Sequence, residues 1–103
     1  MAEGGEGEWR LVNHERIFDS LKGEDDESQR RVREALRRLL QNPRSPADIV
    51  TYPLRGRPAR IYPDRRIAKL PDGWVLTYSM HPDGLPPLGG PIVMAHAFIR
   101  VLM

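Results

Sequence analysis

The sequence lacks cysteine and has no long apolar run, and each absence excludes a class of protein. With no Cys among its 103 residues, the chain has no disulfide, no thiolate chemistry and no Cys-based zinc site. The same absence fits a reducing cytoplasm, where we expect the protein to act. No stretch approaches the roughly 20 apolar residues that span a bilayer, so no membrane partner is expected. Residues 1–8 are acidic and Gly-rich, and they predict neither a signal peptide nor an anchor.

Lysine is scarce where the chain is most basic. Residues 1–27 carry nine acids against three bases, whereas residues 28–103 carry thirteen bases against five acids. Twelve of those thirteen bases are Arg, whose planar fork of N–H donors suits phosphate oxygens better than the point charge of Lys. The second part of the chain is therefore a candidate phosphate-binding surface, although a merely solvated basic surface has the same composition.

Signals for a metal or a cofactor are also missing. The three His residues are scattered without metal-ligand spacing, which argues against a metal site. The Gly-rich residues 88–91 are not followed by a helical pattern, so they do not form a phosphate-binding loop. No Ser, His and Asp stand at a recognisable catalytic spacing. We therefore expect no metal and no cofactor.

We expect a single α+β domain over residues 9–103, preceded by a disordered tail at residues 1–8. The chain is long enough for one hydrophobic core but not for two. Helices are predicted at residues 17–21 and 26–41, and strands at residues 9–14, 49–54, 59–62, 65–70, 74–80 and 92–99. Helices followed by strands predict an N-terminal helical hairpin packed on a mainly antiparallel, twisted sheet of about four strands.

The helix predicted over residues 26–41 has the clearest pattern. Its apolar residues recur at i, i+3, i+4, i+7 and i+8, which places them in one stripe. The stripe comprises Val32, Ala35, Leu36, Leu39 and Leu40. Asp26 and Gln29 resemble a capping box at its start. Asn42-Pro43 ends it, because the residue before a proline is pushed out of the α region.

The strand predicted over residues 74–80 alternates between two faces. Trp74, Leu76, Tyr78 and Met80 share one face, and Val75, Thr77 and Ser79 share the other. Core packing is the expected role of Trp74. Tyr78 has two open interpretations, since a strand aromatic can belong to the core or can stack on a base of single-stranded RNA.

Five segments occur in an order that is typical of one protein family. They are Leu39-Leu40-Gln41-Asn42-Pro43 at a helix end, Leu54-Arg55-Gly56, the basic strand at residues 65–70, Gly73-Trp74-Val75-Leu76-Thr77-Tyr78, and the last strand ending on Arg100. Together they cover about residues 9–100. Their order resembles the RelE/ParE superfamily of bacterial type II toxins, and we expect a RelE-like fold.

The resemblance implies a toxin that cleaves messenger RNA on the ribosome without a metal and is held in check by a cognate antitoxin protein. In such enzymes the ribose 2′-hydroxyl attacks the neighbouring phosphate, and basic groups neutralise the developing charge. Matched by position, the resemblance gives catalytic roles to Arg66, Lys69 and Arg100. The residues that we expect to contact RNA are Arg55, Arg57, Arg60, Arg65 and Tyr78.

Two histidines have different expectations. His96 alternates with Met94 and Phe98, which favours a hydrogen-bonded core position. On the concave sheet face it would instead be a usable general acid or base, and it is the fourth catalytic candidate. His81 precedes Pro82-Asp83-Gly84 and is expected in an exposed loop without a role.

Other functions remain open. Val75 stands where the family pattern has an Arg, which favours a non-cleaving member that inhibits another target, such as DNA gyrase, or acts as a binding module. Arg65 and Lys69 share a strand face while Arg66 points the opposite way, so only part of the basic cluster can act together. A further alternative is an interaction protein whose basic face binds acidic partners.

Overall fold

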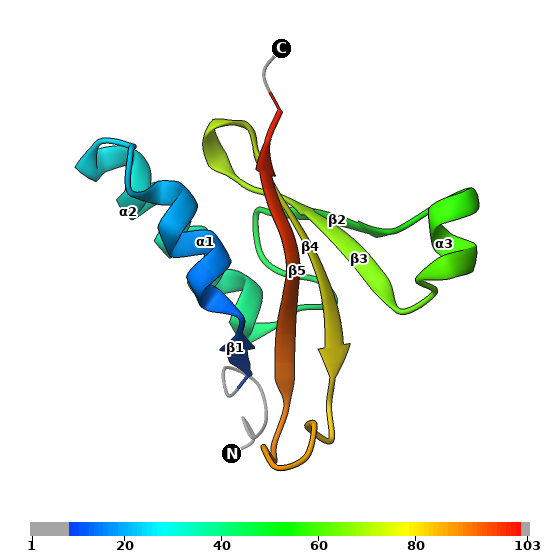
Figure 1. The fold of residues 1–103 in the computed structure, drawn as a ribbon. Coiled ribbons are helices and arrows are strands. Elements are labelled where there is room, and N and C mark those ends of the chain that lie inside the picture. Colours follow the sequence, from blue (N-terminus) through cyan, green and yellow to red (C-terminus); the bar gives the residue numbers. More distant parts are fainter. Residues whose placement is uncertain (1–8, 102–103) are drawn as a thin grey trace.

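The computed structural model describes residues 9–101, which form one sheet with two helices against one of its faces (Figure 1). The strands are β1 (Arg10–Val12), β2 (Val50–Pro53), β3 (Arg65–Lys69), β4 (Trp74–His81) and β5 (Ile92–Arg100). The helices are α1 (His14–Leu21), α2 (Asp26–Gln41) and α3 (Arg57–Ile61), with a short 3-10 turn, η1 (Pro71–Gly73). The α+β class is thus confirmed. The predicted tail at residues 1–8 lies outside the described residues.

The sheet has five strands in the order β1-β5-β4-β3-β2, rather than about four. Neighbours from β2 to β5 pair antiparallel, but β1 pairs parallel to β5, with Arg10 opposite Ile92 and Val12 opposite Met94. The strand predicted at residues 9–14 is present as the short β1, and it adds to the β5 edge. β5 is therefore an inner strand that joins the first strand to the rest of the sheet.

Helix α2 has the predicted bounds, but its N-cap is one residue earlier than expected. Asp25 has an extended backbone, and its Oδ1 accepts a hydrogen bond of 2.8 Å from the backbone N–H of Ser28. The side chain of Gln29 reaches back and donates to the carbonyl of Glu24 at 2.9 Å. The capping box predicted for Asp26 is wrong in register, because Asp26 already has helical geometry.

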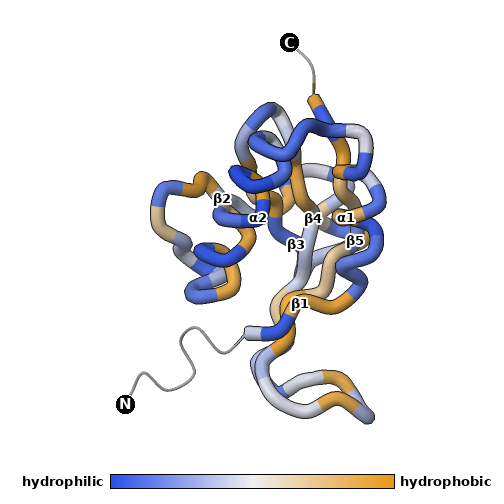
Figure 2. The backbone as a smooth tube through the Cα atoms, turned by 90° about the vertical axis from the view of Figure 1, so that its left-hand side faces the viewer, coloured by the Kyte–Doolittle hydropathy of each residue, from blue (hydrophilic) through white to orange (hydrophobic). Residues whose placement is uncertain are grey.

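The core lies between the helices and the covered face of the sheet. Hydrophilic and hydrophobic residues alternate along α1 and α2 (Figure 2), as expected for helices with one buried face. Ile17 of α1 and Leu39 of α2 are completely buried together with Leu76 of the sheet. Trp74 and Phe98 stack with ring centroids 4.5 Å apart. Complete burial of one such aliphatic side chain contributes roughly 1.5–3 kcal/mol.

Residues 57–61 form a short helix, so the strand predicted at residues 59–62 is wrong. Gly56 precedes the helix with a φ of 69°, and Pro58 occupies its first turn, where its missing N–H and fixed φ are tolerated. The N–H of Tyr62 then donates to the carbonyl of Pro58 at 2.9 Å and closes the turn.

Among the described residues, no helix is both long and apolar enough to cross a membrane.

Candidate functional site

The side chains on the face of the sheet opposite α1 and α2, which we call the open face, form four rows across the strands. The first row comprises Val50, Lys69, Val75 and Ile99, the second Tyr52, Ile67, Thr77 and Ala97, the third Arg65, Ser79, Met94 and Val12, and the fourth His81, Ile92 and Arg10. The first two rows are mostly apolar. The open face is therefore less basic than the sequence suggested, and its polar chemistry gathers around the third row.

A bulge in β5 brings His96 to this row. Thr77 pairs with Ala97 but Tyr78 pairs with Ala95, so His96 is an extra residue on its strand. Such a bulge redirects side chains and breaks the simple alternation of faces. The core position favoured for His96 from its alternation with Phe98 is therefore wrong. Its ring is half-buried and lies on the open face.

Ser79 connects two imidazoles. Its Oγ lies 2.7 Å from Nε2 of His96 and 2.7 Å from Nε2 of His81, and Ser79 itself has no exposed surface. His81 is the last residue of β4, two positions after Ser79, so both side chains point to the same face. The expectation of an exposed loop position for His81 is wrong. We call Ser79, His81 and His96 the histidine bridge.

Arg65 flanks the histidine bridge on β3. It is paired with Ser79 in the sheet, and its guanidinium carbon lies 4.0 Å from the ring centroid of Tyr62. The Nε of Arg65 is buried without a hydrogen-bond partner among residues 9–101. A cation–π contact of this kind holds a guanidinium in place without using its N–H donors. Arg65 is therefore a positioned cation beside Ser79 of the histidine bridge, and its charge acts on His96.

The surroundings favour a neutral ring for His96. Burial lowers the pKa of His96, because the charged imidazolium is poorly solvated there, and the positive charge of Arg65 lowers it further. The carboxylate of Asp64 opposes both effects. A neutral imidazole at pH 7 can accept a proton, which is the state that a general base requires.

Arg66 and Tyr78 lie on the covered face, so neither joins the histidine bridge. Tyr78 has no exposed surface, and its hydroxyl donates a hydrogen bond of 2.7 Å to the carbonyl of Pro43. Its ring offers no face on which a base could stack. Arg66 donates to Thr51 Oγ1 at 3.1 Å and to the carbonyl of Arg44 at 3.4 Å. Both residues tie the segment after α2 to the sheet.

Arg100 also lies on the covered side, where it is already paired. Its Nη1 is 2.9 Å from Oε1 of Glu24, and its Nε donates to the carbonyl of Asp72 at 3.0 Å. Its guanidinium carbon lies 5.4 Å from the ring centroid of Trp74. The residue expected to anchor phosphate thus joins the end of β5 to η1 and to the loop before α2.

Lys69 is on the open face but far from the histidine bridge. Four residues along a strand separate it from Arg65, which corresponds to roughly 13 Å. It lies 5.9 Å from the ring of Tyr52 and borders a shallow hollow at the other end of the face. The lining of this hollow is mainly apolar and comprises Tyr52, Lys69, Leu70, Gly73, Trp74, Val75 and Val101.

The three remaining expected RNA contacts, Arg55, Arg57 and Arg60, are exposed around α3. Helix α3 follows β2 and precedes β3, and it projects from the side of the sheet remote from α1 and α2 (Figure 1). Arg55 lies 6.0 Å from the ring of Tyr52. These side chains extend the positive charge outward from Arg65.

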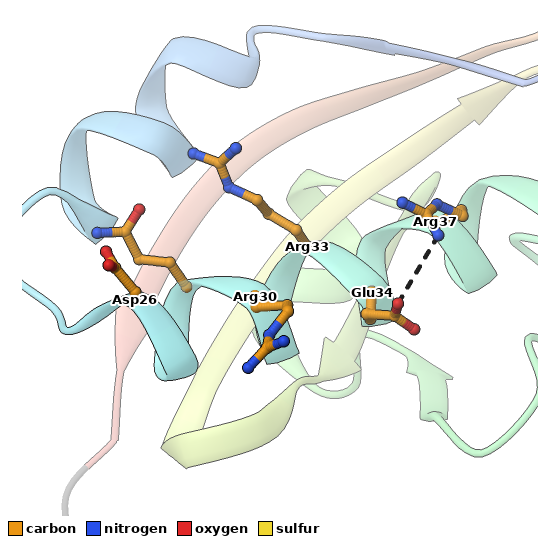
Figure 3. A pocket seen from close by; sticks show the side chains of 6 residues that line it. Asp26, Arg30, Arg33, Glu34 and Arg37 are labelled. Carbon is orange, nitrogen blue, oxygen red and sulfur yellow. Dashed lines mark ion pairs between the residues drawn. The ribbon is translucent and has the colours of Figure 1, made fainter.

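A second group of arginines follows the outer surface of α2 and has a simpler explanation. Figure 3 shows Arg30, Arg33 and Arg37 along this surface with Asp26 and Glu34. Arg37 is 3.7 Å from Glu34, and most of these side chains are exposed. This is the solvated charge of an amphipathic helix, and it contains no nucleophile, imidazole or buried polar group.

Sequence reasoning found His96 and Arg65 but missed Ser79 and His81. The sequence did contain a signal for these two residues, because Ser79 and His81 stand at i and i+2, and residues so spaced on a strand share a face. The bulge that adds His96 to them had no signal in the sequence. Within residues 9–101 no group of three or more His, Asp or Glu side chains could hold a metal ion.

The histidine bridge and Arg65 provide a hydroxyl, two imidazoles and one guanidinium within two adjacent rows of the open face. These groups can move protons and neutralise an anion. No protein-family model, curated protein or solved structure matches the chain. The chemistry of the histidine bridge and Arg65 is therefore the basis for a functional assignment.

Proposed function

We propose that this protein is a metal-independent endoribonuclease that acts as the toxin of a type II toxin–antitoxin system. The observation that supports this proposal most directly is the arrangement on the open face in which Arg65 is paired with Ser79, whose Oγ joins the imidazoles of His81 and His96. The order of segments that resembles the RelE/ParE superfamily supports the same class. The substrate is messenger RNA, bound either free or on the ribosome.

The histidine bridge and Arg65 suit phosphodiester cleavage by the ribose 2′-hydroxyl. One neutral imidazole removes the 2′-hydroxyl proton while the oxygen attacks phosphorus, and the bond from phosphorus to the 5′-oxygen breaks. The leaving oxygen takes a proton from the other imidazole, which gives a 2′,3′-cyclic phosphate and a 5′-hydroxyl end. Arg65 would neutralise the additional charge on the phosphate in the transition state. General acid–base catalysis of this type contributes about 10²–10⁴-fold.

RNA would reach these groups from the side of α3. Arg55, Arg57 and Arg60 are exposed there, and the ring of Tyr62 is 43% exposed beside Arg65. Arginines attract the backbone without sequence preference, and an exposed aromatic ring can stack on a base. The antitoxin would cover the open face, whose apolar rows with exposed Val50 and Ile99 suit a protein partner.

A non-cleaving toxin or binding module is the second candidate. It is favoured by the pairing of Arg100 with Glu24 and by the engagement of Arg66 on the covered face, since both were expected to be catalytic. The apolar position of Val75 removes another cation from the open face.

Cleavage of defined RNA by the purified protein tests the proposal. With EDTA present, wild type should produce 2′,3′-cyclic phosphate ends on free or ribosome-bound RNA. His96→Gln and Arg65→Ala should each lose activity by about 10²-fold or more. His14→Gln is the matched control, because His14 is an exposed histidine on α1 whose ring lies against Phe18, with centroids 5.6 Å apart, and does not belong to the histidine bridge.

Two results would separate the candidates. Intact RNA in both assays, with no slowing of growth when the chain is expressed alone, would refute the toxin assignment. Growth arrest that persists in His96→Gln, with RNA intact, would instead establish the non-cleaving alternative.

A further inference from the structure

The two imidazoles of the histidine bridge approach one buried hydroxyl with the same ring nitrogen. Both Nε2 atoms are 2.7 Å from Oγ of Ser79, so they are no more than twice that distance apart. Ser79 is completely buried, and these are its only side-chain hydrogen bonds within residues 9–101. Neither Nδ1 is hydrogen-bonded or buried there.

The number of protons available restricts which nitrogen of each imidazole can be protonated. A serine hydroxyl has one proton to donate, and a neutral imidazole carries its single proton on either Nδ1 or Nε2. If both Nε2 atoms carried protons, the buried hydroxyl proton would have no acceptor. If neither did, one of the two contacts would lack a proton. Both contacts are hydrogen bonds, and the hydroxyl proton also has an acceptor, only when one Nε2 donates to Oγ and Oγ donates to the other Nε2.

The accessible nitrogens must then differ. The imidazole that donates through Nε2–H has an unprotonated Nδ1, which can accept a proton. The imidazole that accepts at Nε2 carries its proton on Nδ1, which can release it. One base and one acid therefore face the surface together, although the residues are chemically identical.

We propose that Ser79 is a proton relay that holds His81 and His96 as opposite tautomers and so supplies the open face with one general base and one general acid. This inference rests on the proposed ribonuclease function for its substrate. Ser79 itself is a positioning residue, because it acts through the imidazoles and does not touch the RNA.

The relay transfers one proton and keeps the site neutral. A proton from the 2′-hydroxyl enters at the bare Nδ1, and the Nε2–H of that ring passes to Oγ. The hydroxyl proton of Ser79 passes to the second Nε2, and the Nδ1–H of the second ring goes to the 5′-oxygen as its bond to phosphorus breaks. The two rings exchange tautomers, which is the state required for water to open the cyclic phosphate in the reverse sense.

The neighbouring charges agree with a neutral ring at His96. Arg65 of β3 and Arg16 of α1 both disfavour a positive charge on His96, and Asp64 before β3 opposes them. A second proton on the histidine bridge would make both Nε2 atoms donors and leave the buried hydroxyl proton without an acceptor. The two histidines should therefore titrate as a coupled pair, with the second protonation displaced to lower pH.

NMR of imidazole ¹⁵N nuclei tests the relay without RNA. At a pH where both rings are neutral, wild type should show one ring protonated on Nε2 and the other on Nδ1, assigned with His81→Gln and His96→Gln. In Ser79→Ala the two rings should no longer be held as opposite tautomers, and the two histidines should titrate independently. Ser79→Thr keeps a hydroxyl, so it should retain both the opposite tautomers and the coupled titration. Thr77→Val is the matched control, since it removes a hydroxyl from the same face of β4.

The outcomes are distinguishable from those of the functional test. The same tautomer on both rings, or unchanged coupling in Ser79→Ala, would overturn the relay even if RNA is cleaved. Opposite tautomers in a protein that leaves RNA intact would support the relay and refute the ribonuclease. If both hold, Ser79→Ala should lower cleavage by about 10²-fold and flatten its pH profile, while Thr77→Val should not.

Discussion

Removing the hydroxyl of Tyr78 should destabilise the fold and leave RNA binding unchanged. The Tyr78 ring has no exposed surface, and its hydroxyl is the donor to Pro43, which is also fully buried. Tyr78→Phe keeps the ring but leaves a buried carbonyl without a partner. Such a group costs about 1–3 kcal/mol. For a domain of this size each kcal/mol lowers the melting temperature by about 4–8 °C.

Urea denaturation of the wild type and the variant measures this difference. Tyr62→Phe is the control, because the Tyr62 side chain is 43% exposed and has no buried partner to lose. Its free energy of unfolding should stay within about 0.5 kcal/mol of wild type. Fluorescence anisotropy with labelled RNA should give the same dissociation constant for Tyr78→Phe as for wild type.

The pH dependence supplies an independent check. Burial raises the pKa of Tyr78 above its ordinary value, so the folded state holds the phenol neutral more strongly than the unfolded chain does. Stability from this group is complete below about pH 10 and is lost as pH rises through the higher pKa of the folded state. The gap between wild type and Tyr78→Phe should therefore narrow above pH 10. Equal stability of the two proteins at pH 7, or weaker RNA binding by the variant, would refute the assignment of Tyr78 to the core.

Three further experiments test other parts of the fold. Gly73→Ala should lower the free energy of unfolding by about 1–3 kcal/mol in a thermal melt. Gly73 has a φ of 82°, and a Cβ at this position would lie 2.7 Å from the carbonyl oxygen of Val101. Gly23→Ala is the control and should leave the free energy of unfolding unchanged, because a Cβ there meets nothing within 4 Å. A double-mutant cycle of Arg100→Ala and Glu24→Ala should give a coupling of about 0.5–1 kcal/mol that falls with added salt, and additive effects would show that the pair does not form. Asp25→Ala should lower the melting temperature at pH 7 but not well below pH 4. The hydrogen bond from the backbone N–H of Ser28 lowers the pKa of Asp25, so the stability that the carboxylate contributes is lost when it is protonated. A difference in melting temperature that persists in acid would contradict the assignment of Asp25 as the N-cap.

Periodicity predicted the elements whose side chains obey a single regular pattern. Helix α2 follows its apolar stripe, and the faces of β4 follow strict alternation from Trp74 to Met80. The division of Arg65 and Lys69 from Arg66 was also predicted, since it depends only on the two-residue period of a strand. These features are local, so the sequence contains all the information that they require.

The candidate site depends on tertiary pairing, which the sequence does not display. One unpaired residue in β5 moves His96 from the core to the open face, and no composition signal marks that position. The helical conformation of residues 57–61 is set by Gly56 and Pro58 against a β-like run of side chains. The pairing of Arg100 with Glu24 joins residues from opposite ends of the domain. The bulge at His96 and the pairing of Arg100 with Glu24 both depend on tertiary contacts that local propensity cannot specify.

The parallel pairing of β1 with β5 has a consequence for synthesis of the protein. β5 is the last described strand to leave the ribosome, and it contributes the neighbours of both β1 and β4. Until β5 emerges, β1 has no partner strand, one edge of β4 has unpaired backbone N–H and C=O groups, and His96 cannot contact Ser79. Long-range pairing of this kind delays folding relative to local contacts. Completion of the sheet and assembly of the histidine bridge are thus the same late event, so a nascent chain that ends before Ile92 has neither.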